Sequence, residues 1–321
     1  MGGTVVQIVT PAARRSRKGN RVTALRWARL LRAAGHRVRV RSELDGAPCD
    51  VLVVLHAVHG RAAVRAWVEH GRPGKLVIGL SGTDVYGDAG DLDPELFAPA
   101  DRLVALQPLA IRQLPHELRG RARAILQSAA PLADPPPPRE DVFEVVCAAH
   151  LRGVKEPFLA ARAAARLPAG SRVEVVHAGA ALDPLMAAQA EAEARSNPRW
   201  TWLGPVPRAE VLELVARARV FVQTSRHEGG ANALSEALAQ STPVLATRVP
   251  GNVGVLGDAH QGLYRSGDER ELARLLERCE QDAGFLDDLR AASRALVAKL
   301  APERECAAWA ALIAELAPES E

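Results

Sequence analysis

Short apolar runs alternate with longer amphipathic segments along this chain of 321 residues. The first runs are almost continuously aliphatic, which is typical of parallel strands covered on both faces. Between the first two runs lies a helical pattern with Val22, Leu25, Ala28 and Leu31 three residues apart, closed by Gly35. This strand–helix–strand order predicts βαβ units with right-handed crossovers, and hence an α/β fold. The strands expected in the first half are 5–9, 37–40, 51–55, 76–80 and 102–105.

Four consecutive prolines interrupt this order at residues 135–138. Such a run cannot continue a helix or a central strand, and it forms a stiff, extended connector. A chain of this length is expected to form two domains. We therefore predict an N-terminal domain at 1–133, a linker at 134–140 and a C-terminal domain at 141–302. The alternative is a long surface loop within one domain.

The same order restarts after the prolines. A closing amphipathic helix, about 303–316 within the segment 303–321, can pack on either domain, including back on the first. We predict two doubly wound, Rossmann-like domains that face each other across a cleft, with ligands at the carboxyl ends of the strands. The expected strands are 143–148, 172–177, 200–203, 220–223 and 243–246, and the expected helices are 157–166, 184–196, 208–217 and 233–240.

Composition excludes several classes of protein. The net charge of +3 is too small to indicate nucleic-acid binding, and the four cysteines form no C-x-x-C pair. The N-terminus does not resemble a signal peptide, and no apolar run approaches the ~20 residues of a membrane span. We expect a cytoplasmic protein without a membrane span.

The sequence SRHEGGANALSEA at 225–237 is the strongest functional motif. It follows an expected strand and opens an expected helix. Two glycines allow positive φ and close approach to a ligand, Asn232 is a natural helix cap, and amides at a helix start attract anions. Glu228 and Glu236 are eight residues apart, and carboxylates accept hydrogen bonds from sugar hydroxyls. The alternative is that Glu236 complements the helix dipole and Glu228 faces solvent.

This motif, followed by TPVLAT at 242–247, resembles the retaining GT-B glycosyltransferases of family 4. The resemblance covers nearly the whole chain. It implies that Glu236 holds the ribose of a nucleotide diphosphate and that Glu228 lies at the reaction centre. The amides of Gly229, Gly230, Ala231 and Asn232 would contact the hexose. We also place Val206 with the donor-binding residues.

A second motif, HLRGVKEP at 150–157, ends the first strand of the second half and opens a helix. Arg152 and Lys155 are expected to clamp a diphosphate and to stabilise it as it departs. The family usually has an Arg five residues before the Lys. Here that position is His150, so Arg152 acts from a shifted position or His150 shares the donor site. The alternative is a set of exposed basic residues.

A third motif, SGTDVY at 81–86, resembles the family's His-Gly-Thr-Asp stretch, with Ser81 in place of the His. We place Ser81 at the donor sugar and Thr83 and Asp84 at the acceptor, although Asp84 can also simply cap a turn. No Asp-x-Asp element follows a strand, and Asp91 and Asp93 lie in a loop. We therefore expect a metal-independent mechanism that needs no cofactor.

The loop PAARRSRKGNR at 11–21 is crowded with cations. It is either a solvated charge run or a site for a small anionic acceptor, in which arginine side chains act together with helix amides. His56 and His59 end the third strand and are expected to face the same cleft. The acceptor-binding residues predicted in this region are Arg14, Arg15, Arg17, Lys18, Gly19, Asn20, His56 and His59.

The cationic loop and the two motifs at 81–86 and 150–157 together resemble one branch of family 4, the selenosugar synthases of selenoneine biosynthesis. The resemblance implies a UDP-sugar donor, UDP-N-acetylglucosamine, and selenophosphate as the nucleophile. The product would be a 1-seleno-sugar. A dense cation cluster suits such a multiply charged acceptor, whose desolvation requires compensation.

Three other interpretations remain open at this point. The acceptor can be another small anion, such as a hydroxy acid or a phosphorylated polyol. A non-catalytic nucleotide-sugar-binding protein would share the donor motif. A binder of nucleic acid or anionic membranes would use residues 14–21, but only 4% of the chain is aromatic, and the loop has no interleaved aromatic residues.

Overall fold

The computed structural model describes residues 3–13, 19–86 and 94–316. Contacts divide the chain into two compact units. The first unit comprises Met1–Ser128, Glu228–Asn232 and Pro302–Glu321, and the second comprises Ala129–His227 and Ala233–Ala301. The linker at 134–140, with its domain limits, stays a prediction; residues 135–139 adopt neither helix nor strand.

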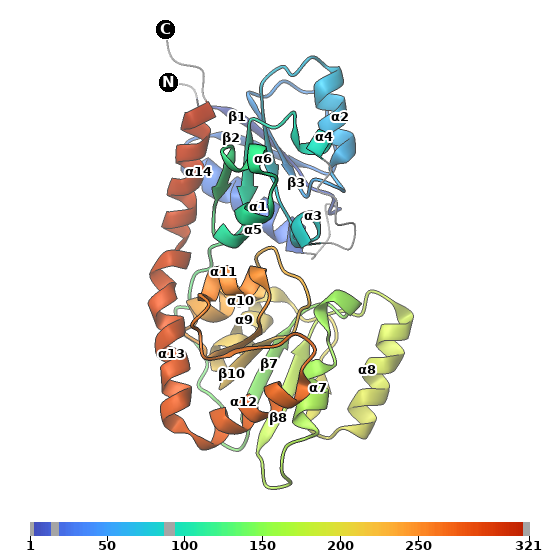
Figure 1. Cartoon of the computed structure of the whole chain (residues 1–321), viewed down its shortest axis with the longest axis vertical. Helices are drawn as coiled ribbons and strands as arrows, with labels where there is room; N and C mark the ends of the chain where they lie inside the picture. The colour runs from blue at the N-terminus through green and yellow to red at the C-terminus, as the bar shows by residue number, and fades with distance from the viewer. Residues whose placement is uncertain (1–2, 14–18, 87–93, 317–321) are drawn as a thin grey trace. The chain divides into compact units, whose positions relative to one another are not determined.

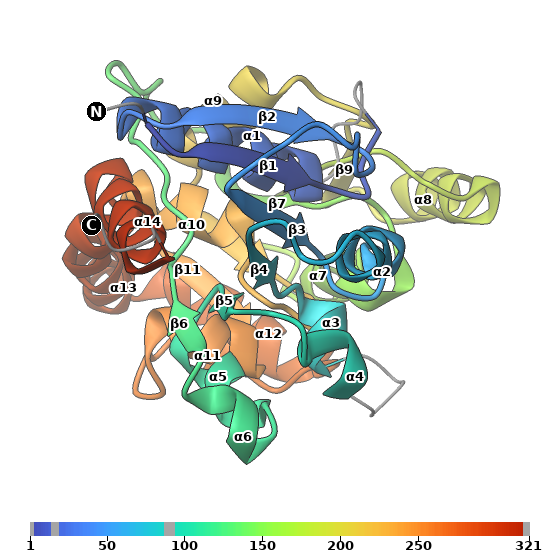
Figure 2. The same cartoon turned by 90° about the horizontal axis from the view of Figure 1, so that it is seen from above.

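The first unit is built on a parallel sheet of six strands in the order β2-β1-β3-β4-β5-β6. Figure 2 shows these strands side by side. The order reverses between β1 and β3, and this reversal is the switch point of a doubly wound sheet. The strands are β1 (Val5–Val9), β2 (Arg37–Arg41), β3 (Val51–Leu55), β4 (Lys75–Gly79), β5 (Arg102–Ala105) and β6 (Ala122–Ala124).

Alternation along β3 shows why these strands are apolar on both faces. Val51, Val53 and Leu55 pack in a cluster with α1 (Gly19–Ala33) and α14 (Pro302–Leu316), whereas Leu52 and Val54 pack in a second cluster with α2 (Arg61–Glu69). Helices α14 and α2 lie on opposite sides of the sheet (Figure 1). The helices of this unit are α1 (Gly19–Ala33), α2 (Arg61–Glu69), α3 (Gly82–Tyr86), α4 (Pro94–Phe97), α5 (Pro108–Gln113), α6 (His116–Arg119) and α14 (Pro302–Leu316).

Helix α14 packs on α1 of the first unit. The rings of Trp27 and Trp309 meet at an angle of 56° with their centroids 4.6 Å apart, and both residues are fully buried. Such an aromatic pair adds about 0.5–1.5 kcal/mol to the effect of its burial. The closing helix expected at 303–316 is therefore present and belongs to the first sheet's core.

The second unit is also built on a parallel sheet of six strands, in the order β12-β11-β10-β7-β8-β9. Its switch point lies between β7 and β10. One face is covered by α7 (Leu159–Ala164), α12 (Glu269–Gln281) and α13 (Ala283–Val297), which pack on Val145, Val175 and Val222. The strands are β7 (Phe143–Ala148), β8 (Val173–Ala178), β9 (Trp200–Trp202), β10 (Val220–Gln223), β11 (Val244–Thr247) and β12 (Leu263–Tyr264).

Side chains of Asp183, Asp268 and Asp282 cap three helices of this unit, α8, α12 and α13, by accepting hydrogen bonds from first-turn amides. The helical segments are η1 (Gly153–Lys155), α7 (Leu159–Ala164), α8 (Pro184–Ser196), α9 (Arg208–Arg217), α10 (Asn232–Ala239), α11 (Pro250–Leu256), α12 (Glu269–Gln281), α13 (Ala283–Val297) and η2 (Ala298–Leu300).

The α/β class is confirmed, and each expected strand is found within a residue of its expected ends. The expectation of five strands in each half is wrong, because β6 and β12 complete the sheets. These two strands have only three and two residues, at sheet edges, and carry no apolar run that would reveal them. Within the described ranges, no helix is both long and apolar enough to cross a membrane.

Candidate active site

The loops at the two switch points carry most of the predicted site residues. In the first unit these loops follow β1 and β3, and they contain Gly19 and Asn20 at the start of α1 and His56 and His59 after β3. In the second unit the loop after β7 contains His150, Arg152 and Lys155. Ligands of doubly wound sheets bind at such points. Arg14, Arg15, Arg17 and Lys18 lie outside the described residues, as do Asp91 and Asp93.

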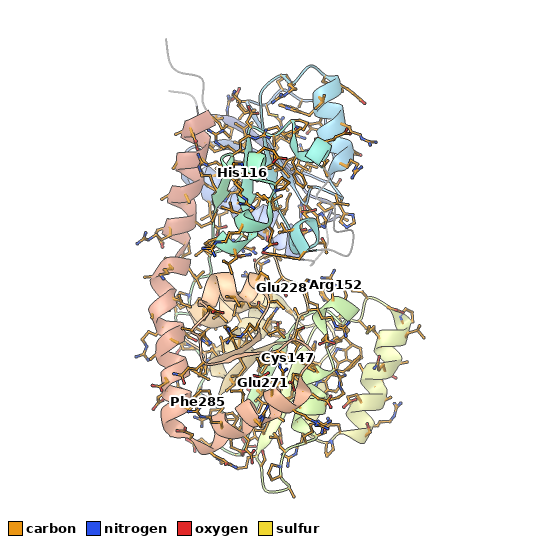
Figure 3. All side chains as sticks on the ribbon, in the orientation of Figure 1. His116, Cys147, Arg152, Glu228, Glu271 and Phe285 are labelled. Atoms are coloured by element: carbon orange, nitrogen blue, oxygen red, sulfur yellow. The ribbon has the colours of Figure 1, made fainter. Side chains whose placement is uncertain are left out.

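The turn after β7 presents two cations of the second unit. Arg152 is exposed at the start of η1, and Lys155 is half-buried at its end. Figure 3 shows Arg152 at the end of the sheet, while Cys147 lies within it. The ring of His150 accepts a hydrogen bond at Nδ1 from the amide of Ala180, 3.2 Å away, so part of this ring is engaged by the fold.

The helix expected at 157–166 is found as α7 (Leu159–Ala164), but Arg152 and Lys155 do not lie at its start. Residues 153–155 form a single 3₁₀ turn, and α7 begins only at Leu159. Glu156 has a left-handed backbone with φ 43°, and proline follows it, so a helix cannot continue directly from the turn. The cations are therefore presented by a turn.

The loop after β10 is bonded to that turn within the second unit. The Thr224 hydroxyl donates to the carbonyl of Lys155 at 2.6 Å, and the Arg226 amide donates to the carbonyl of Val154 at 2.9 Å. The Arg226 guanidinium, still 62% exposed, donates to buried Glu156 at 2.5 Å. Arg226 is thus a third cation at this switch point. Only its place in the loop after a central strand could have drawn attention to it.

Glu236 lies on α10 and is 7% exposed. Its Oε1 accepts two hydrogen bonds from Arg208, at 3.0 Å from Nε and 2.6 Å from a terminal nitrogen. Arg208 begins α9 and is more than half exposed, and half-buried Val206 lies two residues before it. These two hydrogen bonds from a charged guanidinium fix the orientation of the Glu236 carboxyl group.

Residues 228–232 belong to the first unit, where Glu228 is 6% exposed. The predicted positive φ of the glycines is wrong, since neither Gly229 nor Gly230 has a left-handed backbone. They are needed for close packing instead. A Cβ on Gly229 would lie 2.4 Å from the Gly82 nitrogen, and one on Gly230 would lie 2.6 Å from Leu106 Cβ.

Asn232 is the first residue of α10, and its side chain does not cap that helix, contrary to the prediction. Its Oδ1 accepts from Arg26 at 2.6 Å, and its Nδ2 donates to the Thr23 hydroxyl at 3.2 Å. Both partners lie on α1. A Cβ on Gly19 would lie 3.6 Å from Asn232 Nδ2, so the start of α1 adjoins the same segment.

Arg26 is the centre of a buried network that the sequence analysis missed. Its Nε lies 2.9 Å from Glu305 Oε2, and both residues are less than 10% exposed. Glu305 also accepts from the Trp27 indole at 2.9 Å and from the Ser128 amide at 2.7 Å. Gln127 accepts from Arg26 at 2.5 Å and donates to the carbonyl of Gly230. A charged residue within the apolar stripe of each helix, α1 and α14, is the sequence signal for this network.

The first unit also joins the remaining predicted residues, which follow β3 and β4. His56 Nδ1 lies 2.9 Å from Asp84 Oδ1, and His56 Nε2 lies 2.9 Å from the Thr83 hydroxyl. The Ser81 hydroxyl is 3.1 Å from that of Thr83. The His59 ring is tilted by 50° against the His56 ring, with their centroids 4.2 Å apart, and burial together with His56 lowers the pKa of His59.

Within the described ranges, no group of three or more His, Cys, Asp or Glu side chains could hold a metal ion. This observation leaves metal independence a prediction. The second unit places the cations Arg152, Lys155 and Arg226 at its switch point.

Two doubly wound units with polar loops at their switch points define the class of α/β proteins that bind ligands at the carboxyl ends of parallel strands. The family model described as "Glycosyl transferases group 1" matches residues 132–296, just over half of the chain. The chain therefore belongs to this glycosyltransferase family.

Solved structures of similar fold agree over almost the whole chain. HepE of Anabaena, in complex with UDP-glucose, has a TM-score of 0.76 at 15% identity, covering 98% of this chain and 100% of that chain. Sucrose-phosphate synthase of Thermosynechococcus elongatus has a TM-score of 0.77 at 16% identity, covering 98% and 99%. A glycosyltransferase of Rickettsia africae has a TM-score of 0.77 at 12% identity, covering 100% of both. The GT-B fold is thereby confirmed.

Proposed function

We propose that this glycosyltransferase moves a sugar from a UDP-sugar, UDP-N-acetylglucosamine, to selenophosphate. The observation that carries the donor half is the switch point of the second unit. Three cations, Arg152, Lys155 and Arg226, lie on two loops that are hydrogen-bonded to each other at this point. HepE, a protein of similar fold, was solved with UDP-glucose, which supports a uridine diphosphate sugar as the donor.

In this proposal, Arg152 and Lys155 bind the diphosphate and stabilise the negative charge that grows on it as the glycosidic bond breaks. Glu236 accepts hydrogen bonds from the ribose hydroxyls, with Arg208 holding its carboxylate. Glu228 and the amides of residues 229–232 contact the hexose. Arg152 and Lys155 thus neutralise the charge that a metal ion neutralises in other transferases, so the reaction needs no added metal.

The acceptor half rests on the sequence of residues 11–21 and on the resemblance to selenosugar synthases. A loop with Arg14, Arg15, Arg17 and Lys18 suits a small, multiply charged anion, because it compensates the anion for lost hydration. Selenium is already strongly nucleophilic, so it attacks the anomeric carbon without a strong base. The C1–Se bond forms, and the C1–O bond breaks with its electron pair leaving on UDP.

A product assay tests this proposal. Purified enzyme is incubated with UDP-N-acetylglucosamine and either selenophosphate or malate, and the products are identified by mass, then the assay is repeated with other UDP-sugars. We expect a selenium-containing sugar in the selenophosphate arm and no glycosylated malate in the malate arm. UDP release without such a product contradicts the proposed acceptor, and an O-glycosylated malate would identify a hydroxy acid as the acceptor.

The matched variants Glu228→Ala and Glu210→Ala test the site assignment in the same assay. Glu210 is an exposed residue of the first turn of α9. We expect the Glu228 variant to lose turnover and the Glu210 variant to keep it. Full turnover by the Glu228 variant would contradict the assignment of this carboxylate to the reaction centre.

A further inference from the structure

A chain of hydrogen bonds in the first unit ends at an exposed hydroxyl group. Asp84 and His56 are buried, whereas Thr83 is exposed. His56 bridges the other two, with 2.9 Å from Nδ1 to the Asp84 carboxylate and 2.9 Å from Nε2 to Thr83 Oγ1. We call these three residues the triad. A hydroxyl, an imidazole and a carboxylate in this order are the arrangement that activates a nucleophile.

The partners of Asp84 fix the roles along the triad. Burial opposes ionisation of Asp84, but the hydrogen bonds from His56 and from the amides of Ser81 and Val58 hold the pKa of this carboxyl below its usual value. An ionised carboxylate only accepts, so His56 Nδ1 carries the proton and Nε2 accepts from Thr83. The His59 amide also approaches Nδ1, at 3.4 Å, but the carboxylate is the nearer and stronger partner.

The backbone of His56 is held in an unfavourable conformation. Its φ is 74°, in the left-handed region that costs a residue other than glycine about 1–3 kcal/mol. Two backbone hydrogen bonds of 2.8 Å, from His56 to Gly79 and from Gly60 to His56, keep it there. Strain of this kind is concentrated at functional sites, where it sets the position of a side chain.

The proposed reaction contains a second bond cleavage, and none of the residues assigned to donor binding has a role in it. Attack by selenophosphate leaves a sugar whose selenium is still bonded to phosphorus. A 1-seleno-sugar with a free selenol requires that the P–Se bond then breaks. Arg152, Lys155 and Glu236 are assigned to the donor, so this second bond needs its own nucleophile.

We propose that Thr83 is the nucleophile that takes the phosphoryl group from selenium, with His56 as its base. The Thr83 hydroxyl proton passes to His56 Nε2, and a bond forms between Thr83 Oγ1 and phosphorus. The P–Se bond breaks with its electron pair remaining on selenium as a selenolate. Asp84 positions the imidazole and stabilises its positive charge. Water then attacks the phosphorus of phosphothreonine, the Oγ1–P bond breaks, and His56 returns its proton to Thr83.

Ser81 completes the arrangement. Because the Thr83 hydroxyl donates to His56, the contact of 3.1 Å means that the Ser81 hydroxyl donates to Thr83. A lone pair of Thr83 Oγ1 remains available for phosphorus. This inference rests on the proposed function, since it assigns the second bond cleavage of that reaction.

The test separates the two bond cleavages. Wild type and Thr83→Val, Thr83→Ser and His56→Gln variants are incubated with UDP-N-acetylglucosamine and selenophosphate. UDP release reports the first cleavage, and ³¹P NMR distinguishes inorganic phosphate from phosphorus still bonded to selenium. We expect the ratio of phosphate release to UDP release to fall about 100-fold in the valine and glutamine variants, the usual scale for loss of an acid–base group, so that phosphorus accumulates still bonded to selenium. The serine variant should release both products.

Peptide mass spectrometry of quenched wild-type enzyme should find one phosphoryl group on Thr83. Thr201→Val is the matched control, because Thr201 is an exposed residue of β9 in the second unit, and it should behave as wild type. A Thr83→Val enzyme that releases UDP and phosphate as wild type does would overturn this inference alone. A wild-type enzyme that releases no UDP with selenophosphate would overturn the proposed acceptor, and this inference with it.

Discussion

The two switch points of this molecule use their polar groups in different ways. In the first unit, Arg26, Glu305 and Asp84 are buried and bonded to other groups of the protein. In the second unit, Arg152 is exposed, Lys155 is half-buried, and Arg226 keeps most of its surface in solvent. Among these described residues, the charged groups of the first unit are buried and bonded within the protein, whereas the cations of the second unit are partly or largely exposed.

This difference suggests a division of work. An exposed cation on a short turn is available to bind an anionic group, whereas a buried, fully bonded charge holds neighbouring atoms in place. We therefore assign donor binding to the second unit. The first unit positions residues 228–232 and polarises the hydroxyl of Thr83.

Substitution of Arg26 by Met should strongly destabilise the first unit. The change leaves the buried Glu305 carboxylate without its charged partner, which costs about 3–5 kcal/mol. The free energy of unfolding is measured in urea. Arg265, 79% exposed and paired with Asp268, is the matched site, and Arg265→Met should cost less than about 1 kcal/mol. Equal decreases in the free energy of unfolding for the two variants would show that the buried network stabilises the protein no more than an exposed ion pair does.

Substitution of Lys155 by Ala should lower kcat by about 100- to 1000-fold, the effect of removing one group that stabilises transition-state charge. Steady-state UDP release measures it. Lys299 is exposed in η2, so Lys299→Ala controls for loss of a lysine. If both variants turned over alike, leaving-group stabilisation would have to be assigned elsewhere.

Lowering the pH should destabilise the second unit through His177, which donates from Nε2 to the Ala149 carbonyl at 2.9 Å. Burial lowers the pKa of His177 from 6.5 to about 4. The unfolded chain therefore binds a proton that the folded chain excludes, and unfolding becomes easier between pH 6.5 and 4, by about 3 kcal/mol below that window. Urea titrations across this range should show the slope, and His177→Gln should remove it. A slope that persists in the variant would assign it to other groups.

Substitution of Glu236 by Gln should raise the donor KM by about 10- to 100-fold with a smaller change in kcat. A hydrogen bond to a charged group contributes about 1.5–3 kcal/mol, and the variant loses the charge that Arg208 and the ribose share. Glu210→Gln, on the exposed first turn of α9, is the control. A fall in kcat at constant KM would show that Glu236 acts in the catalytic step and not in donor binding.

Much of the fold follows from local patterns in the sequence. Runs such as 51–55 bury both faces of a parallel sheet, so their apolar character is continuous and easily recognised. The positions of the donor motifs follow as well, because the loops after β7 and β10 flank the point where strand order reverses. The short edge strands β6 and β12 have no such pattern.

Contacts between distant segments could not be predicted. Glu305 meets Arg26 across 279 positions, and nothing local to either helix specifies that partner. The glycines at 229 and 230 illustrate the same limit. Their presence suggested an unusual backbone angle, whereas the structure requires them because Gly82 and Leu106 lie too close for a Cβ. Likewise, Asp84 was expected to cap a turn or to bind substrate, and only the structure joins it to His56 and Thr83.

UDP binding measured by calorimetry tests the division between the two units most directly. The wild type is compared with Lys155→Ala and Glu236→Gln in the second unit and with Thr83→Val in the first. We predict that the Kd for UDP rises at least about tenfold in both second-unit variants, as expected for loss of one charged contact, and is unchanged in Thr83→Val. Unchanged binding by the second-unit variants, or weakened binding by Thr83→Val, would contradict the account.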